Sequence, residues 1–155
     1  MSSVKIDNDQ QLREALNDLS LENQRLLGAR FVKSVSHLCN NPLITQGLET
    51  ANDPSRSPQA LVSAYKNAKA FGIEKYTSCG RDADWSGQAE HFVATALAAC
   101  LLPEDQITQQ ENLAWKAAMQ ARMARNCEMI LQDRGEVDNE ASRQYMIVQE
   151  FLTQS

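Results

Sequence analysis

The chain has 155 residues, of which 43% are hydrophobic and 23% are charged, and its formal net charge is −5 at pH 7. This length allows a continuous core that needs no disulfide or metal, and the composition is that of a folded globular protein. The acidic balance argues against a general affinity for nucleic acid, which depends on clustered Lys and Arg. We therefore expect one domain over 1–155, with flexible termini at about 1–8 and 153–155.

The cellular context follows from what the sequence lacks. No stretch approaches the roughly 20 apolar residues that span a bilayer, and the first residues lack the apolar core of a signal peptide. The four cysteines, Cys39, Cys79, Cys100 and Cys127, are widely spaced, unlike those of a secreted disulfide scaffold. We expect a cytoplasmic protein without a membrane partner, whose thiols are reduced and mostly buried.

Apolar residues recur at intervals of three and four, and no alternating run indicates a β-hairpin. The sequence predicts an all-α fold, a compact bundle of about six or seven helices that is either irregular or built from helical hairpins. In the first half, the expected helices are a short one after Asp9 and three more over 21–39, 42–48 and 58–72. Pro42 and Pro58 suit first helical positions, and Gly72 would end the fourth helix in a left-handed conformation.

Two tryptophan-led, alanine-rich segments, 85–100 and 115–131, dominate the second half. The first is apolar on two sides, which is typical of a central helix. Asp84 is its expected cap. Thr108 and Glu111 form a capping-box pattern that predicts the start of the second long helix. A final helix is expected to begin near 138, whereas 73–83 fits either a helical turn or a loop.

On a helical projection of 115–131, Arg122 and Asn126 fall within the arc that holds Trp115 and three methionines. If this arc is buried, the guanidinium needs a partner, because an unpaired buried charge costs several kcal/mol. Three alternatives stay open for Arg122: an interhelical salt bridge, an anchor for an anionic ligand or a partner carboxylate, and simple exposure. The candidate internal partners are Glu74, Asp82, Asp84 and Glu90.

Other polar residues carry weaker signals. His91 lies on the flank of its helix, as a partly exposed acid–base group or a structural histidine. Cys79 precedes Gly80-Arg81 in an expected loop, as a reactive thiol or a passive cysteine. A group of basic residues is expected on a solvated helix face, namely Arg25, Arg30 and Lys33. The chain has no Cys-x-x-Cys, Glu-x-x-His or phosphate-binding glycine loop, so no metal or cofactor is predicted.

The absence of a catalytic motif favours a non-enzyme. Our leading hypothesis is a protein-interaction or scaffold module that presents a groove or face to another protein or to a second copy. The alternative is a small-molecule-binding protein or enzyme with a pocket near Trp85, Trp115 and Arg122, for a small anionic ligand, with His91 or Cys79 as its reactive group. The candidate binding residues are Trp85, His91, Trp115, Arg122 and Asn126.

Overall fold

The computed structural model describes residues 5–78, 84–108, 111–132 and 139–154, and it confirms a compact all-α fold. No strand occurs in these ranges, and the helices number seven, where six or seven were predicted. Short 3-10 turns, η1 (Ser36–Leu38) and η2 (Glu104–Gln106), follow α2 and α5. The helices are α1 (Asp9–Asn17), α2 (Leu21–Val35), α3 (Pro42–Asn52), α4 (Pro58–Ser78), α5 (Trp85–Leu101), α6 (Leu113–Gln132) and α7 (Glu140–Gln154).

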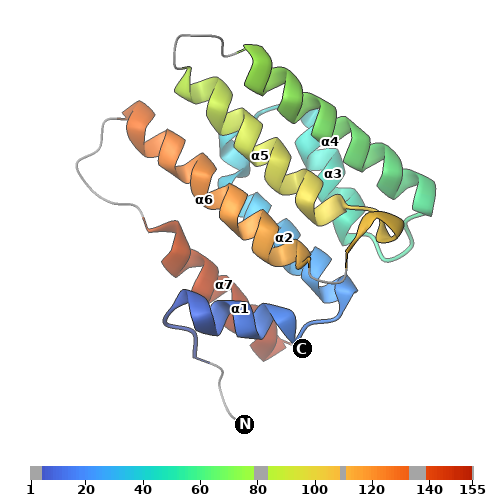
Figure 1. The fold of residues 1–155 in the computed structure, drawn as a ribbon, viewed down its shortest axis with the longest axis vertical. Coiled ribbons are helices and arrows are strands. Elements are labelled where there is room, and N and C mark those ends of the chain that lie inside the picture. The colour runs from blue at the N-terminus through green and yellow to red at the C-terminus, as the bar shows by residue number, and fades with distance from the viewer. Residues whose placement is uncertain (1–4, 79–83, 109–110, 133–138, 155) are drawn as a thin grey trace.

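The helices form two layers and a covered end. In one layer α4, α5 and α6 lie side by side, with α5 in the middle and running opposite to its two neighbours (Figure 1). Helices α2 and α3 lie behind this layer, and α1 and α7 pack across one end of α2 and α6. None of the helices among the described residues is long and apolar enough to cross a membrane. The double-sided apolar pattern of α5 matches its central position.

Helix α5 begins at its predicted cap, since the N–H of Gly87 donates to Asp84 Oδ1 at 3.1 Å. Helix α6 begins later than predicted. The capping pattern exists in part, because the N–H of Thr108 donates to Glu111 Oε2 at 3.0 Å. The helix itself, however, starts at Leu113, with the side chain of Asn112 accepting from the N–H of Trp115 at 2.9 Å. The expectation that Thr108 caps α6 was therefore wrong, because Asn112 supplies the cap nearer to the apolar run.

The prediction that Gly72 ends α4 was also wrong, since α4 runs on to Ser78. A Cβ at Gly72 would lie 3.3 Å from Thr95 Oγ1 on α5. At Gly28 on α2, the equivalent atom would lie 2.9 Å from Cys100 Cβ. Glycine at these places permits close approach of two helices, and at Gly72 this role replaces the left-handed helix end that was expected.

A second buried cluster joins α1 and α7 to α2 and α6, and its members are Ile6, Leu12, Leu16, Leu27, Phe31, Ala114, Ala118, Val148 and Phe151. Ile6 lies in the segment expected to be flexible, yet it is buried, and its N–H donates to Gln149 Oε1 at 2.7 Å. At the other end, Thr153 and Gln154 belong to the last turn of α7. Ile6 therefore belongs to the core, whereas Thr153 and Gln154 are exposed.

The buried face of α6 differs from the face that the projection suggested. Its alanines form the buried side: Ala114, Ala117, Ala118, Ala121 and Ala124 are all fully buried. The bulky arc lies partly outward: Met123 is 43% and Ile130 50% exposed, whereas Trp115 and Met119 are partly buried and pack against the second cluster. Alanine lets α6 lie close to α2 and α5, and this close packing decides which face turns inward.

Candidate functional site

An open groove of about 740 Å³ lies over the outward side of α5. We call it the α5 groove. Its floor is Thr95, Ala98 and Ala99, its walls come from α4 and α6, and Leu102 and Gln106 line its end next to η2. The wall residues are Tyr65 and Lys69 on α4, and Glu111, Trp115, Lys116, Met119 and Gln120 on α6 or just before it. The front layer in Figure 1 shows why these walls face each other, because α4 and α6 flank α5 on both sides.

The groove forms because α5 carries small side chains between the larger side chains of α4 and α6. Ala98 and Ala99 are only partly buried, so the centre of α5 is left uncovered on this side. Tyr65 and Trp115 are partly buried on the flanking helices and stand higher than the alanine floor. Met119 follows Trp115 by four residues and lies on the same side of α6. The result is a mostly apolar trough with aromatic side chains at its edges.

One cation of the groove is unpaired in the described parts of the chain. Lys69 Nζ lies 5.7 Å from the centre of the Tyr65 ring, and no described carboxylate lies within ion-pair distance of it. Lys116, in contrast, is paired with Glu111. The hydrogen bond from Lys116, together with that from the Thr108 N–H, holds the pKa of Glu111 below its ordinary value. Lys69 thus supplies the uncompensated charge of the groove walls.

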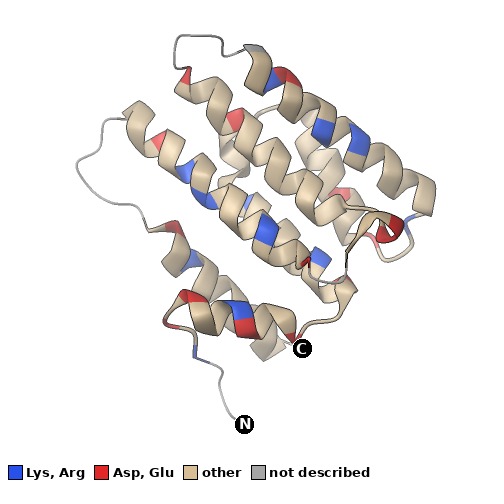
Figure 2. Ribbon diagram, in the orientation of Figure 1, with Lys and Arg blue, Asp and Glu red and all other residues tan. Residues whose placement is uncertain are grey.

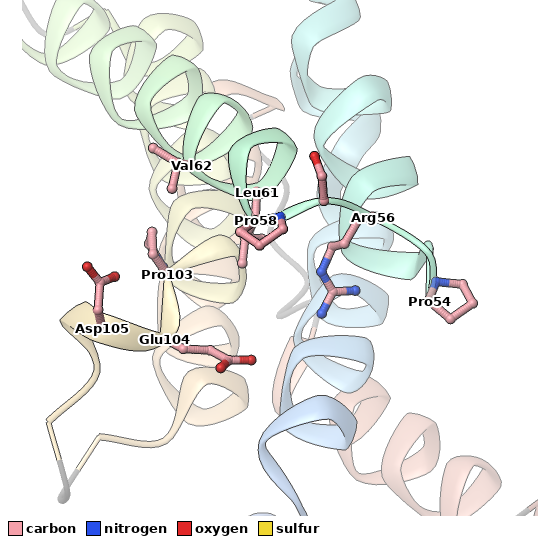
Figure 3. A pocket seen from close by; sticks show the side chains of 9 residues that line it. Pro54, Arg56, Pro58, Leu61, Val62, Pro103, Glu104 and Asp105 are labelled. Atoms are coloured by element: carbon pink, nitrogen blue, oxygen red, sulfur yellow. The ribbon is translucent and has the colours of Figure 1, made fainter.

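A second cavity, of about 440 Å³, lies where α4 begins beside η2 (Figure 3). Its apolar wall includes Pro58, Leu61, Val62 and Pro103, and its charged residues are Arg56, Glu104 and Asp105. In Figure 3, Glu104 extends toward the Arg56 side of the cavity, whereas Asp105 points toward the Val62 side.

The positive charge in this cavity is already engaged. Arg56 donates through both terminal nitrogens to Glu22, at 3.1 and 2.7 Å, and also to the carbonyls of Ala51 and Asp53. Glu104 and Asp105 are exposed and form no ion pair with any residue that the structure describes. Glu104 interacts electrostatically with the buried Arg25 cation, so Asp105 is the carboxylate that gives this cavity its negative side.

Arg122 has an internal partner. Its Nη1 and Nη2 donate to the two carboxylate oxygens of Asp9 on α1, at 3.0 and 2.8 Å, and its Nε donates to Gln144 Oε1 on α7 at 2.8 Å. The hydrogen bond from Arg122, with a second one from Tyr145, keeps the pKa of Asp9 below its ordinary value. Of the three alternatives for Arg122, the structure has the interhelical salt bridge.

None of the three candidate carboxylates that the structure describes pairs with Arg122. Glu90 forms its ion pair with Lys75, at 3.5 Å, and Asp84 caps α5. Glu74 is exposed on α4, and Asp82 lies outside the described residues. The true partner, Asp9, is separated from Arg122 by 113 residues, so no local spacing pointed to it.

The other candidate residues are dispersed. Trp115 lines the α5 groove, whereas Trp85, at the first turn of α5, is partly buried and lines neither cavity. His91 donates from Nδ1 to the carbonyl of Gly72 at 2.7 Å, and its ring packs 5.3 Å from that of Tyr76. These contacts give His91 a structural role, and its ring is partly exposed. Cys79 lies outside the described residues.

Asn126 is exposed, so the expectation of an interior polar contact for it was wrong. The inward polar residues of α6 are its neighbours, Arg125 and Glu128, both of which are 7% exposed. Both lie on the alanine side of α6, whereas the helical projection had taken the opposite side, with Trp115 and the methionines, as the buried one. A search for polar residues on the alanine face would have found them.

Arg125 is the centre of a buried ion network that the sequence did not reveal. It binds Glu128 through Nη1, Glu140 through Nε at 3.0 Å, and the carbonyl of Ser34 through Nη2 at 3.1 Å. His37 Nε2 lies 2.6 Å from Glu128 Oε2. The network joins the end of α2, η1, α6 and α7, so it fixes how these elements meet.

Arg25 was expected on a solvated face but is fully buried. Its Nη1 donates to the carbonyls of Cys100 and Leu102, at 2.8 and 3.1 Å. These carbonyls lie at the C-terminal end of α5, whose last turn has no basic residue of its own. Arg25 on α2 therefore supplies the hydrogen-bond donor for these two carbonyls, and its positive charge is favourable at the negative end of the α5 dipole.

In the described part of the chain, no group of three or more His, Cys, Asp or Glu side chains is arranged to hold a metal ion. Comparison with known proteins identifies no relative, since no family model, no curated protein and no solved structure matches the chain. The α5 groove and the cavity beside it are therefore judged on their own geometry and charge.

Proposed function

We propose that this protein is a helical protein-interaction module whose α5 groove binds an α-helix of a partner protein. The observation that carries the proposal is the outward orientation of the bulky apolar side of α6. Trp115 and Met119 line the groove, and Met123 and Ile130 continue the same side of the helix at 43% and 50% exposure. Trp115 and Met119 also pack in part against the second cluster, so the apolar surface left for a partner is their groove side together with Met123 and Ile130.

The shape of the groove suits a helix better than an extended peptide. The floor of Ala98, Ala99 and Thr95 has no bulky side chain, so a helix backbone can approach α5 closely. Packed helix axes lie about 8–10 Å apart, and a partner helix above α5 would contact both walls. An amphipathic helix in an apolar groove is an established recognition mode, whose anchors recur every three or four residues.

The aromatic walls supply the expected anchor contacts. Tyr65 and Trp115 face the groove from α4 and α6, and both residue types are enriched among the side chains that dominate binding energy. The small residues of α5 make the groove floor complementary in shape to a partner helix, whereas Tyr65 and Trp115 provide most of the apolar contact. Substituting Tyr65 or Trp115 should therefore weaken binding of the partner helix more than substituting an exposed residue of α7.

The small-molecule alternative is weaker on this geometry. It relied on Arg122 as the anchor of an anionic ligand, but both terminal nitrogens of Arg122 are engaged by Asp9 and its Nε by Gln144. Trp115 lines the α5 groove, whereas Trp85 lines neither of the two cavities described above. The groove is open, and small-molecule sites usually enclose most of the ligand surface.

A peptide selection tests the proposal. A display library of 20-residue helix-forming peptides is selected on the native protein alone, and the enriched peptides are then measured on Ala98→Glu, which places a carboxylate on the groove floor. Ser142→Glu, at an exposed position of α7, is the matched control. We expect peptides that bind the native and Ser142→Glu proteins alike and Ala98→Glu at least about tenfold more weakly, since a desolvated carboxylate costs over 1.4 kcal/mol.

Two results would contradict the proposal. One is a selection in which no enriched peptide distinguishes Ala98→Glu from the native protein. The other is a native protein that sediments as a dimer and becomes monomeric in Ala98→Glu, which would assign the groove to a second copy of this chain.

A further inference from the structure

The α5 groove and the cavity beside η2 share one side of α4. Val62 lines the cavity, while Tyr65 and Lys69 line the groove, and the spacings of three and four residues place them on successive turns of one helix face. From Val62 to Lys69 the helix rises about 10 Å. The segment from Leu102 to Gln106 contributes to both, so the groove and the cavity lie next to each other along α4.

The groove and the cavity carry opposite charges at their far ends. At one end is Lys69, which has no carboxylate partner among the described residues, and at the other is Asp105, which forms no ion pair with a described residue. Glu104, next to Asp105, interacts electrostatically with the buried Arg25 cation. The remaining lining charges are engaged in the pairs of Lys116 with Glu111 and of Arg56 with Glu22. Figure 2 shows basic residues along the middle of α4 and acidic residues at η2.

We infer that the α5 groove selects partner helices by the order of their charges, a statement that rests on the proposed function. The bound helix carries acidic residues where it passes Lys69 and basic residues where it passes Asp105. Its central turns, between these ends, present apolar residues to Tyr65, Trp115 and the alanine floor. A helix with the reverse order places like charges together at both ends, which lowers its affinity.

The charges set selectivity more than total affinity, because Lys69 and Asp105 lie at the edge of the surface. Exposed ion pairs contribute at most about 1 kcal/mol each, or up to about fivefold in affinity. Reversing two such contacts should therefore change affinity by about threefold to tenfold. The preference should fade in high salt, since a Debye length of about 3 Å at 1 M screens exposed charges.

Two synthetic helical peptides of identical composition test the inference. They share one apolar stripe, and they differ only in which end is acidic and which is basic. Their affinities are measured by fluorescence anisotropy for four proteins: native, Ala98→Glu, the double variant Lys69→Glu/Asp105→Lys, and Lys66→Glu. Lys66 is an exposed residue of α4 that lines neither cavity, so its variant is the matched control.

We expect the native and Lys66→Glu proteins to prefer the same peptide by about threefold to tenfold, and the double variant to prefer the other. Peptides that lose affinity for Ala98→Glu but show no charge preference, or keep the same preference with the double variant, would overturn the inference and leave the proposed function intact. Binding that is unaffected by Ala98→Glu, or no binding at all, would overturn both.

Discussion

Arg122 and Asp9 form a bidentate ion pair that connects α6 to α1, with both N···O distances between 2.8 and 3.0 Å. The same guanidinium donates its third bond to Gln144, which is fully buried. Arg122 thus holds the covering helices α1 and α7 against α6. Its engagement also explains why this cation, although 6.0 Å from the Trp115 ring, is not the ligand anchor that its position suggested.

Replacing Arg122 by Ala should lower the free energy of unfolding by about 1–3 kcal/mol, because Gln144 Oε1 would lose its buried donor. Asp9→Ala should cost under about 1 kcal/mol, since the Asp9 carboxylate is half exposed and solvent screens its ion pair. Urea titrations of the two variants measure the difference. Equal losses in both variants would mean that the exposed pair, and not the buried amide, provides the stabilisation.

Arg125→Met should be more destabilising, by about 3–5 kcal/mol, because it leaves Glu128 and Glu140 buried without their shared cation. Arg143→Ala is the matched control. Arg143 also donates to Glu140 Oε2, at 2.9 Å, but its own side chain is 45% exposed, so its loss should cost no more than about 1 kcal/mol. Denaturant unfolding of the two variants that gave equal losses would contradict this assignment.

Protonation of Glu128 should contribute to the loss of folding stability at acidic pH. Burial alone would raise the pKa of Glu128, but the hydrogen bonds from His37 and Arg125 outweigh it and hold the pKa below the ordinary value of 4.5. Because the folded pKa is depressed, this stabilisation is present above the unfolded pKa and is lost as the pH falls through the folded pKa. His37→Ala should therefore raise the pKa of Glu128 in a carboxyl NMR titration. An unchanged value would show that His37 does not contribute.

The buried thiols should be unreactive in the folded protein. Burial raises the pKa of Cys100 to about 12, and it also raises the pKa of Cys39, so little thiolate is present at neutral pH. In a Cys79→Ser variant, we expect slow reaction with a disulfide reagent at pH 8 and rapid reaction of all three remaining thiols in denaturant. One equivalent reacting rapidly without denaturant would contradict the burial of one of these cysteines.

The helix positions could largely be predicted from the sequence, because apolar spacing and capping residues are local signals. The central position of α5 followed from its two apolar sides. The orientation of α6 could not be predicted in this way. The projection treated Trp115 and the methionines as the buried side, whereas the close approach of neighbouring helices buries the alanines. That choice depends on the distance between helices, which a single segment does not contain.

The candidate site was only partly predictable for the same reason. Trp115 was identified, but its opposite wall, Tyr65 and Lys69, comes from a helix about 50 residues earlier, and its relation to Trp115 depends on the layer order. The partner of Arg122 and the burial of Arg25 are likewise contacts between distant segments. Charge and residue type suggested that such partners were needed, but only the packing of the helices identified them.

Binding of a helix in the α5 groove is tested most directly by the affinity of a selected helical peptide for the native protein and for Ala98→Glu. The affinities are measured by fluorescence anisotropy, after thermal unfolding has shown that the two proteins have the same melting temperature. We expect the peptide to bind Ala98→Glu at least about tenfold more weakly, because the new carboxylate would be desolvated on the groove floor, and to bind Ser142→Glu like the native protein. Equal affinity for Ala98→Glu and the native protein would contradict the account.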